Sequence, residues 1–286
     1  MHITLNEWLD TWIEAYVKNS KSENTYRCYK DSIRRIRKAE APFLNSDLRD
    51  INEIEIQAFI NSLGKKYAKS TLNHIRVVID QAFATGIVNG YCERNPIHKL
   101  TLPTDAGEKE VRALTQHEQE IVEAAAQTDP LGHIVLFFLY TGLRTHELCN
   151  LKWVDYNKKS KYIIIKKSKT KAGMRIVPLI DEAADILDSL THYNDYIFNN
   201  TRKQPVSETV LKKVYLRLRR KTGIDFVTNH VYRHSFATRL VENGVDYKAL
   251  SSLMGHTDVS FTLRRYATTE YDFLRQQINL LHKDHL

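Results

Sequence analysis

The spacing of apolar residues in the first part of the chain limits its possible folds more than any other feature. Between residues 5 and 83 they recur at separations of three, four and seven, the pattern of helices with one buried face. Thr4 and Glu7 have the spacing of a capping box and mark the start of the first helix. Further stripes span residues 26–36, 54–63 and 72–83. We therefore predict a bundle of four or five short helices over residues 1–98.

The helical periodicity lapses after Asn95 and Pro96, where turn-forming and charged residues follow. We predict a linker over residues 99–111 and a second domain over residues 112–286. Thr115 and Glu118 form another capping box, and residues 162–165 and 175–178 have the pattern of a β-hairpin. The expected fold class is mainly α with a small β-sheet: an N-terminal helical bundle followed by a mixed α+β domain.

The composition indicates a soluble protein with a polyanionic partner. The 286 residues include 42 Lys and Arg against 34 Asp and Glu, a net charge of +8, and most of the excess follows residue 105. Charge of this sign fits nucleic acid or an acidic membrane surface. Three cysteines without metal-ligand spacing favour a reducing cytoplasm. The longest apolar run, residues 134–140, is far below the ~18 residues of a membrane span, and no signal sequence opens the chain.

Four short segments of the second domain carry the most chemistry. They are residues 141–148 with Arg144, the hairpin turn with Lys169, residues 230–238 with His230 and Arg233, and Gly255 and His256 followed by Tyr266. Arginine forks bind phosphate bidentately, and His230 precedes Arg233 by one helical turn on the same face. Together these residues indicate a site for one phosphate. Singly, each has a plainer interpretation: a surface ion pair between Arg144 and Glu147, a structural His256 and a packed Tyr266.

The order and spacing of these segments resemble the catalytic domain of the tyrosine recombinases, the phage and transposon integrase family. The resemblance covers residues 112–270 and places the helical bundle where the family has a SAM-like core-DNA-binding domain. It implies site-specific recombination of double-stranded DNA through a 3′-phosphotyrosyl intermediate, without metal, ATP or another cofactor. It also implies a tetramer on DNA formed from a chain that is monomeric when free. The implied catalytic residues are Arg144, Lys169, His230, Arg233, His256 and the nucleophile Tyr266.

The resemblance also assigns roles to individual residues. Lys169 is the implied general acid for the leaving 5′-oxygen, with Lys171 as its substitute in the same turn. Tyr266 follows His256 by ten residues, as in integrases of conjugative transposons, whereas many members have nine. Tyr271 is the nearby substitute, but it lacks the family's Arg-Tyr-Ala context, and its plainer interpretation is packing. A tyrosine hydroxyl with a pKa of ~10 must lose its proton as it attacks phosphorus. The tail, residues 270–286, has an apolar helical face that either docks on a neighbouring copy or packs within its own chain.

Two basic segments are candidates for contacts with the DNA backbone. Residues 158–175 hold eight basic residues and no acid, and residues 211–221 hold six on a predicted helix. The plainer interpretation of both is a charged face in solvent. The DNA-contact candidates are Lys166, Lys167, Lys171, Arg175, Lys212, Lys213, Arg217, Arg219 and Arg220.

Three other functions share some of these features. A type IB topoisomerase uses the same tyrosine chemistry to relax DNA, and a DNA-binding regulator would need only the basic surface. A zinc site is suggested by the spacing of His230 and His234, but Val231 stands where a metalloprotease has its general-base glutamate. The complete set of polar residues and Tyr266 favours the recombinase.

Overall fold

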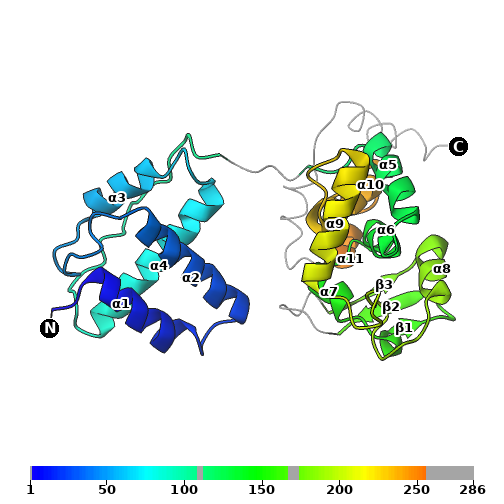
Figure 1. Cartoon of the computed structure of the whole chain (residues 1–286), viewed down its shortest axis with the longest axis horizontal. Helices are drawn as coiled ribbons and strands as arrows, with labels where there is room; N and C mark the ends of the chain where they lie inside the picture. The colour runs from blue at the N-terminus through cyan, green and yellow to red at the C-terminus, as the bar shows by residue number, and fades with distance from the viewer. Residues whose placement is uncertain (1, 108–111, 167–173, 256–286) are drawn as a thin grey trace, which may run out of the picture. The chain divides into compact units, whose positions relative to one another are not determined.

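The computed structural model describes residues 2–107, 112–166 and 174–255. The chain divides into two compact units, Met1–Glu110 and Val111–Leu286, which are considered separately below (Figure 1). Both are mainly helical, and the second contains a small antiparallel sheet, so the predicted fold class is confirmed. Within the described ranges, no helix has the length and apolar character needed to cross a membrane.

The first unit buries most of the apolar stripes that the sequence predicts, but Tyr16 and Ile54 of those stripes are exposed. Its α-helices are α1 (Leu5–Trp12), α2 (Glu23–Lys38), α3 (Glu53–Ser62) and α4 (Lys69–Val88), and α1 continues into a π-helix, Ile13–Val17. Trp8 and Trp12 are almost fully buried between these helices. The indole N–H of Trp8 donates to the carbonyl of Ala82 at 2.8 Å, which fixes α1 on α4.

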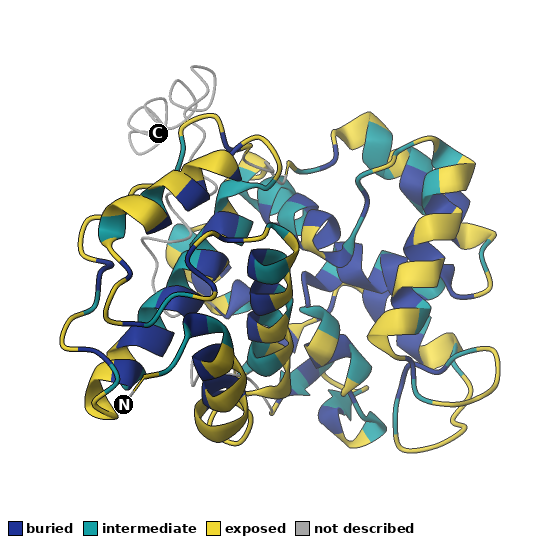
Figure 2. Ribbon diagram, turned by 60° about the vertical axis from the view of Figure 1, so that its left-hand side comes forward, coloured by how far each residue is buried: buried dark blue, intermediate teal, exposed yellow. Residues whose placement is uncertain are grey.

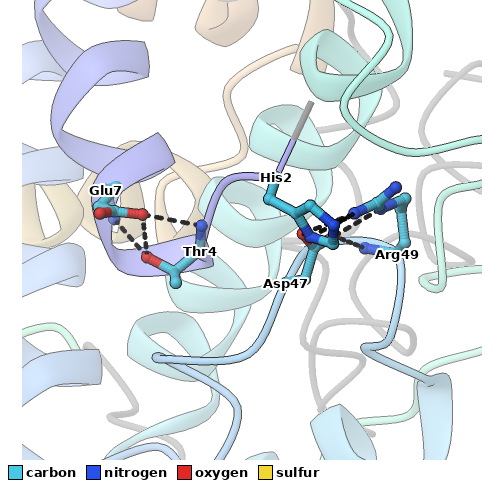
Figure 3. A network of polar contacts seen from close by, with 5 residues as sticks. All are labelled: His2, Thr4, Glu7, Asp47 and Arg49. Carbon is cyan, nitrogen blue, oxygen red and sulfur yellow. Dashed lines mark hydrogen bonds and ion pairs between the residues drawn. The ribbon is translucent and has the colours of Figure 1, made fainter.

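Polar contacts hold the start of α1 in place (Figure 3). The hydroxyl of Thr4 accepts from the backbone N–H of Glu7 at 3.3 Å, and the Glu7 carboxylate accepts from the N–H of Thr4 at 3.0 Å. This is the predicted capping box, and it is confirmed. Beside it, the Asp47 carboxylate contacts His2 at 2.7 Å and Arg49 at 2.8 Å. The N-terminus is thereby tied to the loop between α2 and α3.

The chain that follows α4 folds back onto α3. The backbone N–H of Lys99 donates to the Glu53 carboxylate at 2.7 Å, and that of Thr101 donates to the Gln57 side chain at 2.9 Å. The first part of the segment expected to be a linker, residues 99–111, is therefore hydrogen-bonded to the first unit.

The second unit surrounds one apolar helix, α6 (Gly132–Thr141), whose Phe137 and Phe138 are fully buried. The helices α5 (Gln116–Gln127), α8 (Asp181–Ser189) and α10 (Asn229–Glu242) pack directly against α6, and α9 (Glu208–Thr222) packs on α5. In both units the helices turn buried residues inward and exposed residues outward (Figure 2). The core of the second unit therefore lies around α6.

A small sheet covers one end of this core. Its strands are β1 (Tyr156–Asn157), β2 (Tyr162–Ile165) and β3 (Arg175–Pro178), antiparallel in the order β1-β2-β3, and a 3₁₀-helix, Trp153–Asp155, precedes β1. Ile163 is paired with Val177, and both are buried in the core that includes α8. The predicted hairpin is confirmed, while residues 167–173 of its turn lie outside the described ranges.

Two short helices complete the part of the unit that holds the candidate site. Helix α7 (Thr145–Cys149) follows α6 and contacts α9, whereas α11 (Tyr247–Met254) packs against both α10 and β3. A separate apolar cluster of Ala237, Leu250 and Met254 joins α10 to α11. Helices α7, α9 and α10 line one cavity, and α11 and β3 are joined to α7 by hydrogen bonds.

Candidate active site

Helices α7, α9 and α10 enclose a cavity of about 740 Å³ in the second unit. Arg144, His230 and Arg233, three of the residues predicted to be catalytic, line it together. Among the residues that the structure describes, the lining consists of Arg144, Thr145, His146, Glu208, Leu211, Lys212, Tyr215, Arg219, Thr228, Asn229, His230, Arg233 and His234. These described residues include four arginine and lysine side chains and one glutamate, a basic lining that suits a bound anion.

The backbone before α7 directs Arg144 toward this cavity. Helix α6 ends at Gly142, which has a left-handed conformation with φ of 61°. A Cβ atom there would approach the ring of Phe236 to 2.4 Å, so the position requires glycine for both conformation and space. Two residues later Arg144 is the N-cap of α7, and its guanidinium donates to the Gly255 carbonyl at 2.9 Å.

The buried carboxylate of Glu147 binds Arg144. Its carboxylate accepts from the backbone N–H and from Nη1 of Arg144, both at 2.9 Å, and also from Arg175. The Glu147 side chain is 0% exposed and that of Arg144 29% exposed, so the ion pair expected at the surface is largely buried. Burial alone would raise the pKa of Glu147, but the hydrogen bonds from Arg175 and Arg144 lower it to about 2.

Helix α10 supplies the second arginine and a histidine. Thr228 caps its N-terminus, and His230 and Arg233 lie one turn apart, so both reach the same cavity. Arg233 is 7% exposed, and its guanidinium donates to the carbonyls of Gly142 and Met254. These two carbonyls orient the fork, and Arg233 lines the cavity together with Arg144 and His230.

Only part of the basic helix α9 faces the cavity. Lys212 and Arg219 line it, seven residues apart on one face, and Arg219 also donates to the Val227 carbonyl. Lys213 and Arg220 are exposed on another face, and neither lines the cavity. The guanidinium of Arg217 pairs with Asp129 at 2.7 Å, away from the cavity.

The predicted DNA-contact residues of the basic hairpin differ in their exposure and in their ion pairs. Lys166 is exposed and pairs with Asp155 at 2.6 Å. Arg175 is buried against Glu147 rather than exposed beside the lysines. The structure leaves the remaining predicted residues, namely Lys167, Lys169, Lys171, His256, Tyr266, Tyr271 and the tail 270–286, outside the described ranges.

Sequence reasoning did not assign a site role to Glu147, and it did not foresee that the Arg175 side chain is only 6% exposed. The spacing of Arg144 and Glu147 suggested their pairing, but nothing in the sequence brings Arg175 to the same carboxylate. His230 and His234 both line the cavity, yet the described part of the chain contains no group of three potential metal ligands. The zinc interpretation thus gains no third ligand among those residues.

Comparisons with known proteins match most of the chain. The model described as phage integrase family matches residues 107–272, and the phage integrase N-terminal SAM-like domain matches residues 4–64. The tyrosine recombinase XerA of Pyrococcus furiosus is 30% identical over 266 residues, which cover 90% of this chain and 88% of that protein.

Two solved structures have similar folds. The Tn1549 transposon integrase in complex with transposon right end DNA has a TM-score of 0.81 at 21% identity, covering 98% of this chain and 100% of that chain. A lambda integrase dimer bound to a COC′ core site has a TM-score of 0.78 at 26% identity, covering 94% of this chain and 79% of that chain.

Proposed function

Because the chain belongs to the phage integrase family of tyrosine recombinases, we infer that it is an enzyme that breaks and rejoins DNA strands at specific sites. The observation that carries this function is the convergence of Arg144, His230 and Arg233 in one basic cavity. Two guanidinium forks and an imidazole match the charge and the oxygen geometry of a DNA phosphodiester.

In the proposed reaction, Tyr266 Oη attacks the phosphorus of the scissile phosphodiester and loses its proton. The new bond joins Tyr266 to the 3′-phosphate, while the bond from phosphorus to the 5′-oxygen breaks and Lys169 donates a proton to that oxygen. Negative charge grows on the phosphate oxygens as the tyrosine attacks. Arg144 and Arg233, with His230 and His256, stabilise that charge, each such donor being worth roughly 10²–10³ in rate.

The covalent intermediate conserves the energy of the broken phosphodiester bond in the phosphotyrosyl bond. When the 5′-hydroxyl of another strand attacks the phosphotyrosine, the tyrosine leaves and a phosphodiester forms again. One phosphoester replaces another at each step, so the exchange is nearly balanced in energy and consumes no nucleotide triphosphate.

Lys212 and Arg219 are the proposed backbone contacts beside the reacting phosphate. They share the cavity with the two catalytic arginines, whereas Arg217 is neutralised by Asp129 and Arg175 is buried. Contacts of this kind fix the position of a duplex without reading its sequence.

The chain acts on DNA as a multimer, as the lambda integrase dimer on a core site and the lambda integrase tetramer on a Holliday junction illustrate for that protein. We propose that four copies of this chain assemble around two duplexes. Each of the four strand cuts then has its own Tyr266, and one round of exchange needs two cuts and two religations.

A DNA duplex nicked next to the cut site tests the proposed chemistry, because loss of the short fragment prevents religation and traps the covalent complex. We expect the native chain to form a protein–DNA adduct and Tyr266→Phe to form none while binding the duplex normally. Tyr271→Phe is the matched control, and its adduct should form at the native rate. An adduct that survives Tyr266→Phe and disappears with Tyr271→Phe would transfer the nucleophilic role to Tyr271.

A further inference from the structure

We propose that Arg175 is a positioning residue of the active site, which fixes Arg144 relative to the C-terminal turn of α11. The proposal rests on the proposed function, since it concerns how the phosphate site is held. It replaces the expectation that Arg175 contacts DNA together with the lysines of the hairpin.

The contacts of Arg175 are directed into the protein. Its side chain is 6% exposed, and Nη1 and Nη2 donate to the two oxygens of the Glu147 carboxylate at 3.0 and 3.1 Å. Its Nε donates to the backbone carbonyl of Leu253 at 2.6 Å. One guanidinium thereby links β3, α7 and α11.

These contacts belong to a closed ring that includes Arg144. Glu147 also accepts from Nη1 of Arg144, and Nη2 of Arg144 donates to the Gly255 carbonyl, both at 2.9 Å. Gly255 and Leu253 are in the same turn, so the ring runs from Arg175 through Glu147 and Arg144 to that turn and back. A shift of any member changes the position of Arg144.

The turn itself needs cationic donors. The last carbonyls of an α-helix have no partner within the helix and carry its negative dipole end. At the end of α11 the carbonyls of Leu253, Met254 and Gly255 each accept from a different arginine: Arg175, Arg233 and Arg144. Of these three, Arg175 does not line the cavity. Since His256 follows Gly255 in the sequence, the turn that Arg175 holds is also where the chain continues to the proposed catalytic histidine.

Replacement of the guanidinium of Arg175 by a single ammonium group separates the effect of its charge from the effect of its hydrogen-bond geometry. Arg175→Lys keeps the positive charge beside Glu147, but one ammonium group cannot donate to both carboxylate oxygens and to Leu253 with the planar geometry of arginine. We expect adduct formation on the nicked duplex to slow by about 10–100-fold, because misplacement of a catalytic group by ~1 Å costs about that much. The dissociation constant for the duplex should remain within about twofold of the native value, because the Arg175 side chain is directed into the protein, toward Glu147 and Leu253.

Arg112→Lys is the matched control, because Arg112 also pairs through two nitrogens with a glutamate, Glu118, at 2.6 Å but lies outside the cavity. It should form the adduct at the native rate. Circular dichroism tests whether each variant is folded. If Arg175→Lys does not fold, Arg175→Gln replaces it in the adduct assay.

A double-mutant cycle distinguishes positioning from a general effect on the fold. If Arg175 acts through Arg144, then Arg175→Lys should slow adduct formation much less in an Arg144→Lys background than in the native one. Native rates for folded Arg175→Lys and Arg175→Gln, or rate losses that simply multiply in the cycle, would overturn the proposal while the proposed function stands. Absence of an adduct with the native chain would instead overturn the proposed function and this inference with it.

Discussion

Glu147 is the buried carboxylate on which two arginines converge, and its hydrogen bonds orient Arg144. A carboxylate without exposed surface must be compensated by charge and hydrogen bonds, and Arg144 and Arg175 supply both. Arg144 is thereby held by Glu147 and the Gly255 carbonyl at the wall of the basic cavity. A guanidinium in that position suits an anionic ligand.

The first prediction concerns the removal of this carboxylate charge. Glu147→Gln should lower the free energy of unfolding at neutral pH by roughly 3–5 kcal/mol, because the buried Arg175 loses its counter-charge. The pKa of Glu147 is about 2 in the folded protein, below its ordinary value of 4.5, so its ionised form stabilises the fold above pH 4.5. The difference in stability between the native chain and the variant should then shrink as the pH falls from 4.5 toward 2.

Urea unfolding at a series of pH values measures both effects. Glu242→Gln is the control, since the Glu242 carboxylate that pairs with Arg239 is 52% exposed, and the stability of this variant should stay within about 0.5 kcal/mol of native. Equal losses for the two variants would contradict the buried role of Glu147.

The sequence was sufficient to select Arg144, His230 and Arg233, but it could not describe Arg175. The first three are recognised by short-range patterns, and the structure brings them into one cavity. Arg175 stands in a run of basic residues, where solvent exposure is the normal expectation. Its burial depends on pairing with Glu147, which is 28 residues earlier and on another element, and no local pattern records such a contact.

Among the elements, the turn from α6 to α7 determines where α7 begins and therefore where its N-cap residue, Arg144, lies. The second prediction compares Gly142→Ala with Gly223→Ala, because both glycines end helices with left-handed backbones, φ being 61° and 75°. Each alanine should cost about 1–2 kcal/mol of unfolding free energy for its conformation. Gly142→Ala should cost more, since its Cβ would lie 2.4 Å from Phe236, whereas Gly223 has nothing within 4 Å. Thermal unfolding of both variants makes the comparison, and equal losses would show that the contact with Phe236 is relieved cheaply.

Helix α9 carries cations on more than one face, and the third prediction separates those faces. Lys212→Gln should weaken binding to the DNA site and make the negative slope of log K against log salt shallower by about 0.9, the share of one phosphate contact. Lys213→Gln should leave that slope unchanged, because Lys213 is exposed and does not line the cavity that Lys212 lines. Fluorescence anisotropy with a labelled duplex over a range of salt concentrations gives both slopes. The opposite order would place the DNA on the other face of α9.

Helices and strands marked by capping boxes or by alternating apolar residues could be predicted from the sequence. Elements without such local patterns could not. The capping boxes at Thr4 and Thr115 and both strands of the hairpin are present as expected. Strand β1 has two residues, Tyr156 and Asn157, too few to show an alternating pattern. The π-helix after α1 keeps the same buried stripe as an α-helix, so its altered hydrogen bonds leave no mark in the sequence.

For the whole molecule, the division into two units is visible in the sequence as a loss of periodicity, but the behaviour of the connecting chain is not. Lys99 and Thr101 are bound to α3 through backbone N–H groups, which any residue other than proline provides. The candidate site lies within the second unit, and the charge excess of the sequence is concentrated there as well. The candidate site and most of the excess positive charge thus lie in the same unit.

The most direct test of the account is the effect of Arg144→Ala on two quantities measured with the same nicked duplex. Glu147 keeps its pairing with Arg175 in this variant, so the fold should persist. We expect the rate of covalent adduct formation to fall by at least about 10²-fold, because Arg144 stabilises charge that develops in the transition state. The dissociation constant should change by only a few-fold. A native rate of adduct formation, or a loss of affinity that accounts for the whole effect, would contradict the claim that this cavity holds the reacting phosphate.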